Sequence, residues 1–550
     1  MGIVHHFQEG SNMHNSIKLT IVLLLLISIV DGSTDSTSTG LSPIPLDLKV
    51  NPANDTTDNS APIQTNIKVA VFDAVTNRRH PLFKNASLQQ VVNEDVAPAS
   101  KPNIILILAD NVGYMDPGCY GGGAVVGAPT PRLDQMAKEG LRMTSYYSET
   151  QCTPTRAAMM TGRLPIRTGM NQATAPGLNA GLSPNEVTLA KVLSDAGYKT
   201  AMFGKWHLGD INESEPQNVG FDEYFGQLYH LNAYSQKERI GYDPESEIGN
   251  PIYGLVEAKK GENLRVVAPL NMTSIAFVDE QVTDKAIEYI KNQSNSADPF
   301  FVYLSFARTH FPSVQNPKWA GKSSKGPYGD GMMEMDSYVG DVLDVLKKTG
   351  QAKDTLVVFV SDNGPTLDQW PDSGYSPFRG MIGTAYEGGV RVPGIFWWPG
   401  TIETGRTSNE IMCAVDLFNT FAALGGGEVP TDRPIDGIDQ SNFLLGRQNE
   451  SSRSGAIWFM GSESAYPHAV RWHQFKILER AYDSMAGPVS EYGQSPAVYN
   501  IEMDPGEQHN IAGEHDFVLN AFTKISREYA ASLAEFPNTP SRAYPLTSGD

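Results

Sequence analysis

The sequence predicts an α/β fold, in which a large sheet of mostly parallel or mixed strands lies between helices and a smaller α+β domain follows. Two patterns carry this prediction: short apolar runs recur between residues 104 and 398, and amphipathic, helix-like segments alternate with them. Uninterrupted apolar runs are typical of strands buried on both faces, and alternation with helices is typical of parallel sheets. Polar clusters follow several of the runs, so we expect their side chains to meet at one edge of the sheet.

The elements follow this alternation along the chain. The first strand is predicted at residues 104–108, which are all apolar, and it leads into the polar pair Asp110 and Asn111. Further strands are predicted at residues 199–203, 299–306, 356–360 and 394–398, and helices at residues 131–140, 188–196 and 332–348. After about residue 450 the alternation weakens, and segments 469–479 and 498–505 indicate the smaller domain.

The N-terminal part of the chain is predicted to precede the folded domains. Residues 17–30 are apolar apart from Lys18, and they are fewer than the ~20 that a membrane span needs. Residues 1–32 are therefore predicted to be a secretory signal peptide, although the long polar segment before the apolar stretch leaves an uncleaved signal anchor as an alternative. Residues 33–98 are predicted to be an extension or linker to which we assign no function, with 33–65 disordered. The main domain then spans 99–453 and the C-terminal subdomain 454–550.

Composition excludes some classes of protein. A net charge of −20 argues against nucleic acid as the main partner. The three cysteines, Cys119, Cys152 and Cys413, are too few for a disulfide framework, and the sequence leaves open whether Cys119 and Cys413 pair.

Glycosylation sequons start at Asn54, Asn85, Asn212, Asn271, Asn292 and Asn449. Behind a signal segment, they favour a secreted or lysosome-like glycoprotein.

One short motif stands out as the centre of the site expected at the sheet edge. It reads Cys152-Thr-Pro154-Thr-Arg156 and continues into a short apolar helix. Pro154 suits the first turn of a helix, where its missing N–H is not needed. The helix N-terminus then directs partial positive charge at residue 152, and Arg156 can reach the same place with a fork of donors. The alternative is an ordinary buried cysteine before a helix.

This motif resembles the C-x-P-x-R signature of the sulfatase family. The resemblance runs from about Pro102 to Ala512 in several ordered motifs, and segment 220–234 is most similar to the arylsulfatase branch. It implies that a formylglycine-generating enzyme oxidises Cys152 to Cα-formylglycine. One hydroxyl of the hydrated aldehyde would attack sulfur, and the second would expel sulfate. The resemblance thus implies a sulfuric ester hydrolase of the alkaline phosphatase superfamily, with 99–453 as its catalytic domain.

The resemblance also implies one divalent cation, Ca²⁺ rather than Mg²⁺. Its ligands would be Asp110, Asn111, Asp362 and Asn363, together with residue 152. Carboxylate and amide oxygens are what such hard cations prefer. Asp-Asn pairs after strands can also be simple turn formers. Many family members have a second aspartate at the position of Asn111, so a lower metal affinity is expected here.

Four further side chains receive roles from the resemblance. Arg156 and the metal would polarise the nucleophile and neutralise charge on the sulfuryl oxygens. Lys205 and His207 lie in a G-K-W-H motif. Lys205 would bind the sulfate or the aldehyde hydrate as a compact cation, and His207 would be the base that helps the hydrate collapse and release sulfate. His310, in a His-x-Pro motif, would donate to the leaving oxygen.

One position departs from the family pattern. The family has a lysine within R-G-x-K, and this chain has Ile382 there. An isoleucine cannot hold sulfate, and the lost charge-assisted contact is worth about 1.5–3 kcal/mol. Arg379 and His230 are the candidates to compensate, and Arg379 is more readily explained as a framework residue. A distinct substrate preference or a slower enzyme is expected.

Two alternatives stay open. Arg156 and Lys205 would also suit the phosphate of a phosphonate or phosphate-ester hydrolase, and Ile382 would suit a catalytically silent protein that binds sulfated glycans. The substrate class, aryl or carbohydrate sulfate, is not fixed. Aromatic residues in 224–234 and 370–378 could stack on it or could simply pack. The sequence makes no prediction of the oligomeric state.

Overall fold

The computed structural model describes residues 101–178, 180–235, 250–461, 466–479 and 496–537. The predicted signal segment and linker lie outside these residues, so both remain predictions. All the described residues belong to one compact unit. Within them, no helix combines the length and the apolar character needed to cross a membrane.

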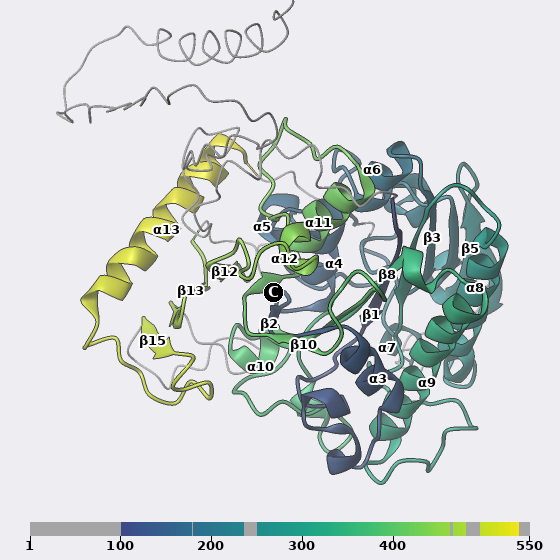
Figure 1. The fold of residues 1–550 in the computed structure, drawn as a ribbon, viewed down its shortest axis with the longest axis horizontal. Helices are drawn as coiled ribbons and strands as arrows, with labels where there is room; N and C mark the ends of the chain where they lie inside the picture. Colours follow the sequence, from purple (N-terminus) through teal and green to yellow (C-terminus); the bar gives the residue numbers. More distant parts are fainter. Residues whose placement is uncertain (1–100, 179, 236–249, 462–465, 480–495, 538–550) are drawn as a thin grey trace, which may run out of the picture. The chain divides into compact units, whose positions relative to one another are not determined.

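A large mixed sheet forms the centre of the fold, as predicted (Figure 1). Its strands run in the order β10-β2-β9-β8-β1-β7-β3-β4-β5-β6, and β11 pairs with β2. Their bounds are β1 Asn103–Ala109, β2 Leu141–Tyr147, β3 Lys199–Gly204, β4 Glu223–Gly226, β5 Gly254–Lys259, β6 Arg265–Pro269, β7 Phe300–Ser305, β8 Thr355–Ser361, β9 Arg391–Trp397, β10 Arg406–Ser408 and β11 Met412–Cys413.

The five strands β8, β1, β7, β3 and β4 are parallel, which brings their carboxyl ends to one edge. Outside these five strands the sheet is mixed: β9, β5 and β6 pair antiparallel with their neighbours, whereas β10 and β11 pair parallel with β2. The segment predicted at 394–398 is β9, which runs antiparallel to both β8 and β2. No long crossover helix lies between β8 and β9 to carry the chain back across the sheet, and a parallel partner would need such a crossover.

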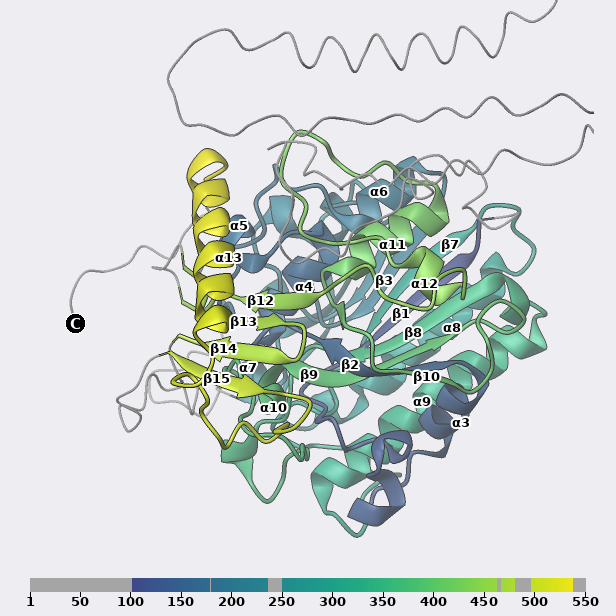
Figure 2. The same cartoon turned by 60° about the vertical axis from the view of Figure 1, so that its left-hand side comes forward.

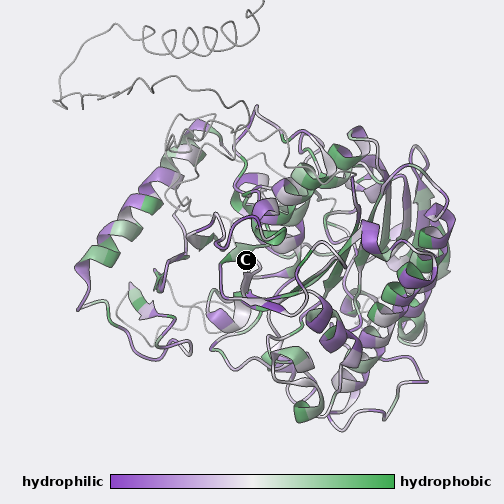
Figure 3. Cartoon of the chain, in the orientation of Figure 1, coloured by the Kyte–Doolittle hydropathy of each residue, from purple (hydrophilic) through white to green (hydrophobic). Residues whose placement is uncertain are grey.

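Helices cover both faces of the sheet. Along β1, Ile104, Leu106 and Leu108 pack into the core beneath α4, α6 and α11, whereas Ile105 and Ile107 pack beneath α3, α8 and α9. Figure 3 shows apolar strands between helices that alternate in polarity. The longer helices are α3 Pro131–Glu139, α4 Cys152–Thr161, α6 Leu189–Asp195, α8 Val278–Gln293, α9 Pro327–Lys348, α11 Asp416–Gly425 and α13 Asp516–Glu535, and the short ones are α5 Pro165–Thr168, α7 Asn232–Ser235, α10 Glu387–Val390 and α12 Ser441–Leu444.

A second, antiparallel sheet follows the large sheet, in line with the predicted smaller α+β region (Figure 2). It comprises β12 Gly455–Trp458, β13 Ala469–Trp472, β14 Phe475–Leu478 and β15 Ala497–Asn500. One face of this sheet packs on α13 through Val518 and Phe522. Its other face packs on Tyr147 and Tyr386 of the main domain.

A buried ion cluster joins this second sheet to the main domain. Lys476 of β14 is fully buried, and its Nζ lies 3.0 Å from Glu387 Oε1 and 3.1 Å from Glu507 Oε1. The Glu507 carboxylate also accepts the backbone N–H of Glu387. Burial raises the pKa of Glu507 to about 7, although Lys476 lowers it. The cation therefore compensates two buried carboxyl groups at the base of α10.

Replacing Lys476 with methionine is expected to lower the free energy of unfolding by about 3–5 kcal/mol, because it leaves buried acids without their cation. Chemical denaturation measures this loss. The matched control is Lys191→Met in α6, where an exposed i,i+4 pair with Asp195 is worth ~1 kcal/mol or less. Equal losses in the two variants would show that the buried cluster does not hold the sheets together.

Candidate active site

The polar clusters that follow the central strands meet at one edge of the sheet. Asp110 and Asn111 follow β1, Asp362 and Asn363 follow β8, and Lys205 and His207 follow β3. His310 comes shortly after β7. The ligand atoms of Asp110, Cys152 and His310 all lie within 4.8 Å of one another. The structure thus brings together side chains from four parallel strands and from α4.

Residue 152 begins α4, and two threonines of its motif fix that helix end to the sheet. Thr153 Oγ1 donates to the carbonyl of His207 at 3.0 Å, and Thr155 Oγ1 donates to the carbonyl of Asp362 at 2.5 Å. Cys152 Sγ lies 3.6 Å from Asp110 Oδ1. Burial, together with Asp362, raises the pKa of the Cys152 thiol well above its usual value. The encoded thiol is therefore a poor nucleophile, because only the thiolate attacks readily.

Arg156 is fully buried one turn into α4 and holds the strand ends in place. Its Nη2 donates to Asp362 Oδ2 at 2.8 Å and approaches Asp110 Oδ2 at 3.4 Å. Its Nη1 donates to Ser305 Oγ at 2.5 Å and to the Lys205 carbonyl at 2.9 Å. Arg156 thus orients both carboxylates.

Lys205 enters the site through a turn that only glycine fits. Gly204 has a φ of 104°, and a Cβ there would meet the carbonyl oxygen of Ser305 at 1.9 Å. Lys205 is fully buried, and its Nζ lies 2.5 Å from Asp110 Oδ2. Two buried cations, Lys205 and Arg156, therefore balance the buried acids Asp110 and Asp362.

The donor set around Asp110 fits a hard cation. Asn363 Nδ2 donates to Asn111 Oδ1 at 2.6 Å, which leaves Asn363 Oδ1 buried with no hydrogen-bond partner among the described residues. Burial and Asp110 raise the pKa of Asp362, while Arg156 and Lys205 lower it. An orphaned amide oxygen beside two buried carboxyl groups is the kind of ligand set that Ca²⁺ or Mg²⁺ uses.

The two predicted catalytic histidines are held through one ring nitrogen each. His207 Nε2 lies 2.9 Å from the Thr174 carbonyl, and its Nδ1 is buried without a partner among the described residues. His310 Nδ1 lies 2.6 Å from the Phe311 carbonyl. Because a nitrogen that faces a carbonyl must be the protonated one, the other nitrogen of each neutral ring is an acceptor. Burial and Lys205 lower the pKa of both rings, that of His310 to about 3.

Ile382 lies next to the strand ends, so the departure from the family pattern affects the site itself. Its backbone N–H donates to the Pro365 carbonyl at 3.1 Å, and the next residue, Gly383, donates to the Thr150 carbonyl at 2.7 Å. The Ile382 side chain is only 5% exposed. Arg379 is a framework residue: its Nη1 donates to the Glu507 carbonyl, and its guanidinium stacks over the Tyr386 ring.

Most of the aromatic residues suggested as substrate contacts prove to be packing residues. Tyr224, Tyr229 and Tyr234 are buried. Phe378 packs between Tyr114 and Arg391. Two rings remain open to solvent, Trp370 at 70% and Tyr375 at 41% exposure. The backbone of Tyr375 lies close to the residues predicted to bind the metal, because its carbonyl accepts the N–H of Met115, shortly after Asn111 in the chain.

Sequence reasoning missed the supporting hydroxyls of the site. Thr309 Oγ1 donates to the Asp110 carbonyl at 2.5 Å, and Ser305 Oγ accepts from Arg156. Thr153 and Thr155 flank Pro154 within the motif, and this position was the only indication of their role in the sequence. Nothing in the sequence signalled Ser305 or Thr309. All three cysteines are free, so Cys119 and Cys413 do not pair.

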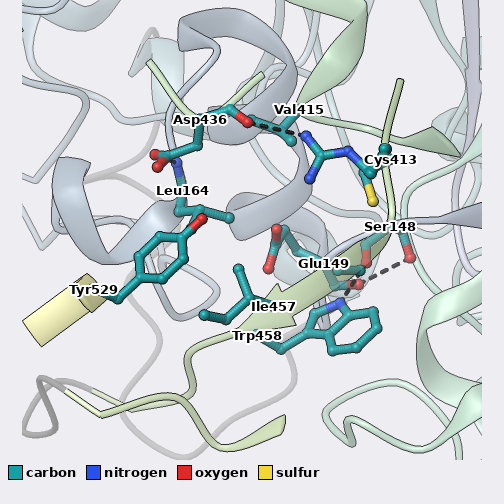
Figure 4. A pocket seen from close by; sticks show the side chains of 11 residues that line it. Ser148, Glu149, Leu164, Cys413, Val415, Asp436, Ile457, Trp458 and Tyr529 are labelled. Atoms are coloured by element: carbon teal, nitrogen blue, oxygen red, sulfur yellow. Dashed lines mark hydrogen bonds between the residues drawn. The ribbon is translucent and has the colours of Figure 1, made fainter. Parts of the chain in front are cut away.

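A small cavity of about 10 Å³ lies between the start of α4 and the second sheet, and none of the predicted site residues lines it (Figure 4). Its lining includes Glu149, Asp436, Arg453, Trp458 and Tyr529. Among the described residues, the Glu149 carboxyl has no hydrogen-bond or ion-pair partner, although Arg453 binds Asp416 nearby. Burial, reinforced by Asp436, raises the pKa of Glu149 to about 8, while Arg453 lowers it.

Replacing Glu149 with glutamine is expected to stabilise the fold more as the pH rises from about 5 to about 8. The folded pKa of Glu149 lies above its unfolded value of 4.5, so the folded state binds more protons between these values. Wild-type stability contributed by this group is therefore lost as pH rises, by up to a few kcal/mol. The melting temperatures of variant and wild type, compared across this range, measure the effect. A difference that does not change with pH would contradict it.

Comparison with known proteins decides the family. A family model described as Sulfatase matches residues 102–427. The chain belongs to the sulfatase family. It is similar to human arylsulfatase A, with 36% identity over 456 residues, which cover 78% of this chain and 86% of that protein. Rat N-acetylgalactosamine-6-sulfatase is 32% identical over 463 residues, with the same two coverages.

Solved structures agree with this assignment. The PsFucS1 sulfatase from Pseudoalteromonas sp. has a TM-score of 0.74 and 35% identity and covers 82% of this chain and 94% of its own. Ps i-CgsB, solved in complex with k-i-k-neocarrahexaose, has a TM-score of 0.66 and 27% identity, and the match covers 82% of this chain and 96% of that one. A phosphonate monoester hydrolase from Silicibacter pomeroyi, at 17% identity and a TM-score of 0.56, shares the fold alone.

The predicted family, fold class and reaction are therefore confirmed. The protein is an enzyme, a sulfatase that hydrolyses sulfate esters. Family membership also implies a metal ion and the formylglycine modification in general terms.

Proposed function

We propose that this sulfatase hydrolyses the sulfate ester of a carbohydrate, with residue 152 as formylglycine at the reacting centre. The observation that carries the proposal is the position of residue 152, which begins α4 beside the fully buried cations Lys205 and Arg156. A helix N-terminus and two desolvated cations favour an anion such as sulfate. The hydrate of formylglycine supplies two hydroxyls, one to bond to sulfur and one through which sulfate can be released.

We propose that one Ca²⁺ is held at the same edge, with Mg²⁺ less favoured. Its ligands would be residue 152 and the oxygens of Asp110, Asn111, Asp362 and Asn363. The orphaned Oδ1 of Asn363 and the closeness of Asp110 to residue 152 support this set. When bound, the ion supplies positive charge that favours attack at sulfur. Asn111 leaves the set with two carboxylates, and we expect a correspondingly weak affinity.

The side chains around residue 152 have distinct tasks in this proposal. Lys205 holds the sulfuryl group as a compact cation, and Arg156 fixes the carboxylates that orient the centre. The unprotonated Nδ1 of His207 accepts a proton from residue 152 when sulfate departs. Its lowered pKa supports this, because a base must be neutral to act.

His310 is proposed to protonate the departing oxygen. In the substrate-free protein its pKa of about 3 keeps the ring neutral, with a bare Nε2. A bound sulfate ester brings negative charge close to the ring, which raises the pKa and favours a proton on Nε2. The proton would then pass to the ester oxygen as the S–O bond breaks.

A carbohydrate sulfate is favoured over an aryl sulfate by two observations. The names of one curated relative and one solved neighbour refer to sugars, N-acetylgalactosamine and neocarrahexaose. On this chain, the exposed rings of Trp370 and Tyr375 suit the apolar face of a sugar. We also propose passage through the secretory pathway, where a formylglycine-generating enzyme would act on Cys152. Four described sequons, at Asn212, Asn271, Asn292 and Asn449, are exposed, which suits glycosylation.

Parallel assays on 4-nitrophenyl sulfate, 4-nitrophenyl phosphate and a panel of sulfated monosaccharides test the proposal. The protein should be made in a host that converts other sulfatases. Sulfate release, faster from a sulfated sugar than from the aryl ester, is expected. Preferred cleavage of the phosphate would favour the phosphate-ester alternative. No sulfate release from protein that carries formylglycine would favour the silent binding protein.

A further inference from the structure

Three histidines form a row at the active site. The ring centroids of His207 and His230 lie 5.1 Å apart with an interplanar angle of 81°, and those of His230 and His310 lie 5.1 Å apart at 6°. His230 is the middle ring. It lies in the loop between β4 and α7, so it reaches the site from the carboxyl end of β4, the fifth of the parallel strands.

The hydrogen bonding of His230 leaves one ring nitrogen available as a donor. The backbone N–H of Ala233 donates to His230 Nδ1 at 3.2 Å. The same N–H also donates to the His230 carbonyl at 3.1 Å. The contact with Nδ1 favours the neutral tautomer that carries its proton on Nε2, and Nε2 has no hydrogen-bond partner among the described residues. The ring is half-buried, and burial, His310 and Lys205 keep it neutral by lowering its pKa. His230 is thus a fixed N–H donor beside two acceptor histidines.

One position near the strand ends, residue 382, offers substrate no hydrogen-bond donor from its side chain. Ile382 is held beside the strand ends by its own N–H and that of Gly383, and its side chain offers no donor. A sulfuryl group at residue 152 has three oxygens to satisfy. Lys205 serves one side, while Arg156 is already bound to Asp362, Ser305 and the Lys205 carbonyl.

We propose that His230 binds substrate, donating its Nε2–H to a sulfuryl oxygen in place of the contact that Ile382 cannot make. This inference rests on the proposed function of the same site. A hydrogen bond to a charged oxygen is strong, and its loss lowers kcat/KM by about 10- to 100-fold. The contrasting role would be that of a spacer, in which the ring only keeps His207 and His310 apart.

Two substitutions separate a donor from a spacer. His230→Phe keeps a ring of similar shape and removes the N–H, whereas His230→Gln keeps an N–H donor and removes the ring. For 4-nitrophenyl sulfate, we expect kcat/KM to fall about 10- to 100-fold in the Phe variant and only a few-fold in the Gln variant. The reverse order, with Phe active and Gln impaired, would overturn the proposal in favour of a spacer. Equal activity of both variants and wild type would also overturn it.

A lysine at position 382 provides the second test. If His230 replaces that contact, Ile382→Lys should raise kcat/KM of the His230→Phe variant by about tenfold or more. The same substitution should have a smaller effect when His230 is present, because the two donors then serve the same oxygen. An equal effect in both backgrounds would show that the two positions are independent and would contradict compensation.

A binding measurement keeps this inference separate from the proposed reaction. Inorganic sulfate is the probe, and its stabilisation of each protein against heat is the readout. Sulfate should stabilise wild type and His230→Gln at lower concentrations than His230→Phe, by about tenfold. This difference is expected even if wild type fails to hydrolyse the ester, in which case the proposed function alone would fall. Identical sulfate dependence in all three proteins would overturn the role of His230.

Discussion

Replacing Cys152 with alanine is expected to lower the rate of sulfate-ester hydrolysis by about 10⁴-fold or more, because it removes the only side chain that can become formylglycine at the head of α4. Losses of this size are typical when a nucleophile is removed. The fold should survive, since Cys152 packs at a helix end and its thiol makes one long contact, to Asp110. Steady-state assays and melting curves measure both effects. Activity that survived the change would disprove the proposed chemistry.

Cys152→Ser is the matched control, because it keeps one hydroxyl in the same place. A single hydroxyl can form a bond to sulfur, but it lacks the second hydroxyl through which sulfate is released. We expect at most one turnover, followed by serine that carries a sulfate group, which intact-protein mass spectrometry detects. Continuous turnover by the serine variant would show that the second hydroxyl is not needed.

Exhaustive chelation of divalent cations is expected to lower activity by about 10³-fold, with recovery when Ca²⁺ is added back. A metal ion at a developing negative charge contributes several kcal/mol, and each 1.36 kcal/mol is a factor of ten. Because the ion binds only the folded protein, Ca²⁺ should also raise the melting temperature. Mg²⁺ should restore less of either property.

Asn363→Ala tests the site itself, because Asn363 Oδ1 is the orphaned oxygen. This variant should need much more Ca²⁺ for both activity and thermal stabilisation. The control is Asp368→Asn, which removes an exposed carboxylate in the loop after β8 and should leave both dependences as in wild type. Activity that is indifferent to chelation would exclude the proposed metal site.

The central fold could be predicted from sequence because its strands are buried on both faces. The inner residues of β1 and β8, 104–109 and 356–360, are uninterrupted apolar runs, whereas β2 shows why other strands were harder to recognise. In β2, polar Arg142 and Thr144 alternate with buried residues, and its partner β9 is antiparallel. α8 was also missed, although Val278, Val282 and Ala286 repeat at helical spacing.

The sequence named the residues of the candidate site, but it could not show their geometry. Motifs named Asp110, Lys205 and His310, and parallel strands brought them together. Sequence could not show that Arg156 is bound to Asp362 and Ser305, because that depends on strands distant in the chain. The free ring nitrogens of the histidines depend likewise on local carbonyls such as that of Thr174.

Mass spectrometry of the peptide that spans residues 143–156 tests the central claim most directly. The protein should come from a host that carries a formylglycine-generating enzyme and that converts other sulfatases. An aldehyde at residue 152 is the predicted result, and it would show that the modifying enzyme accepts this motif with Gln151 before it. An unmodified thiol in that host would contradict the account, because the buried Cys152 thiol is a poor nucleophile and Ile382 would then mark a site that has lost its chemistry.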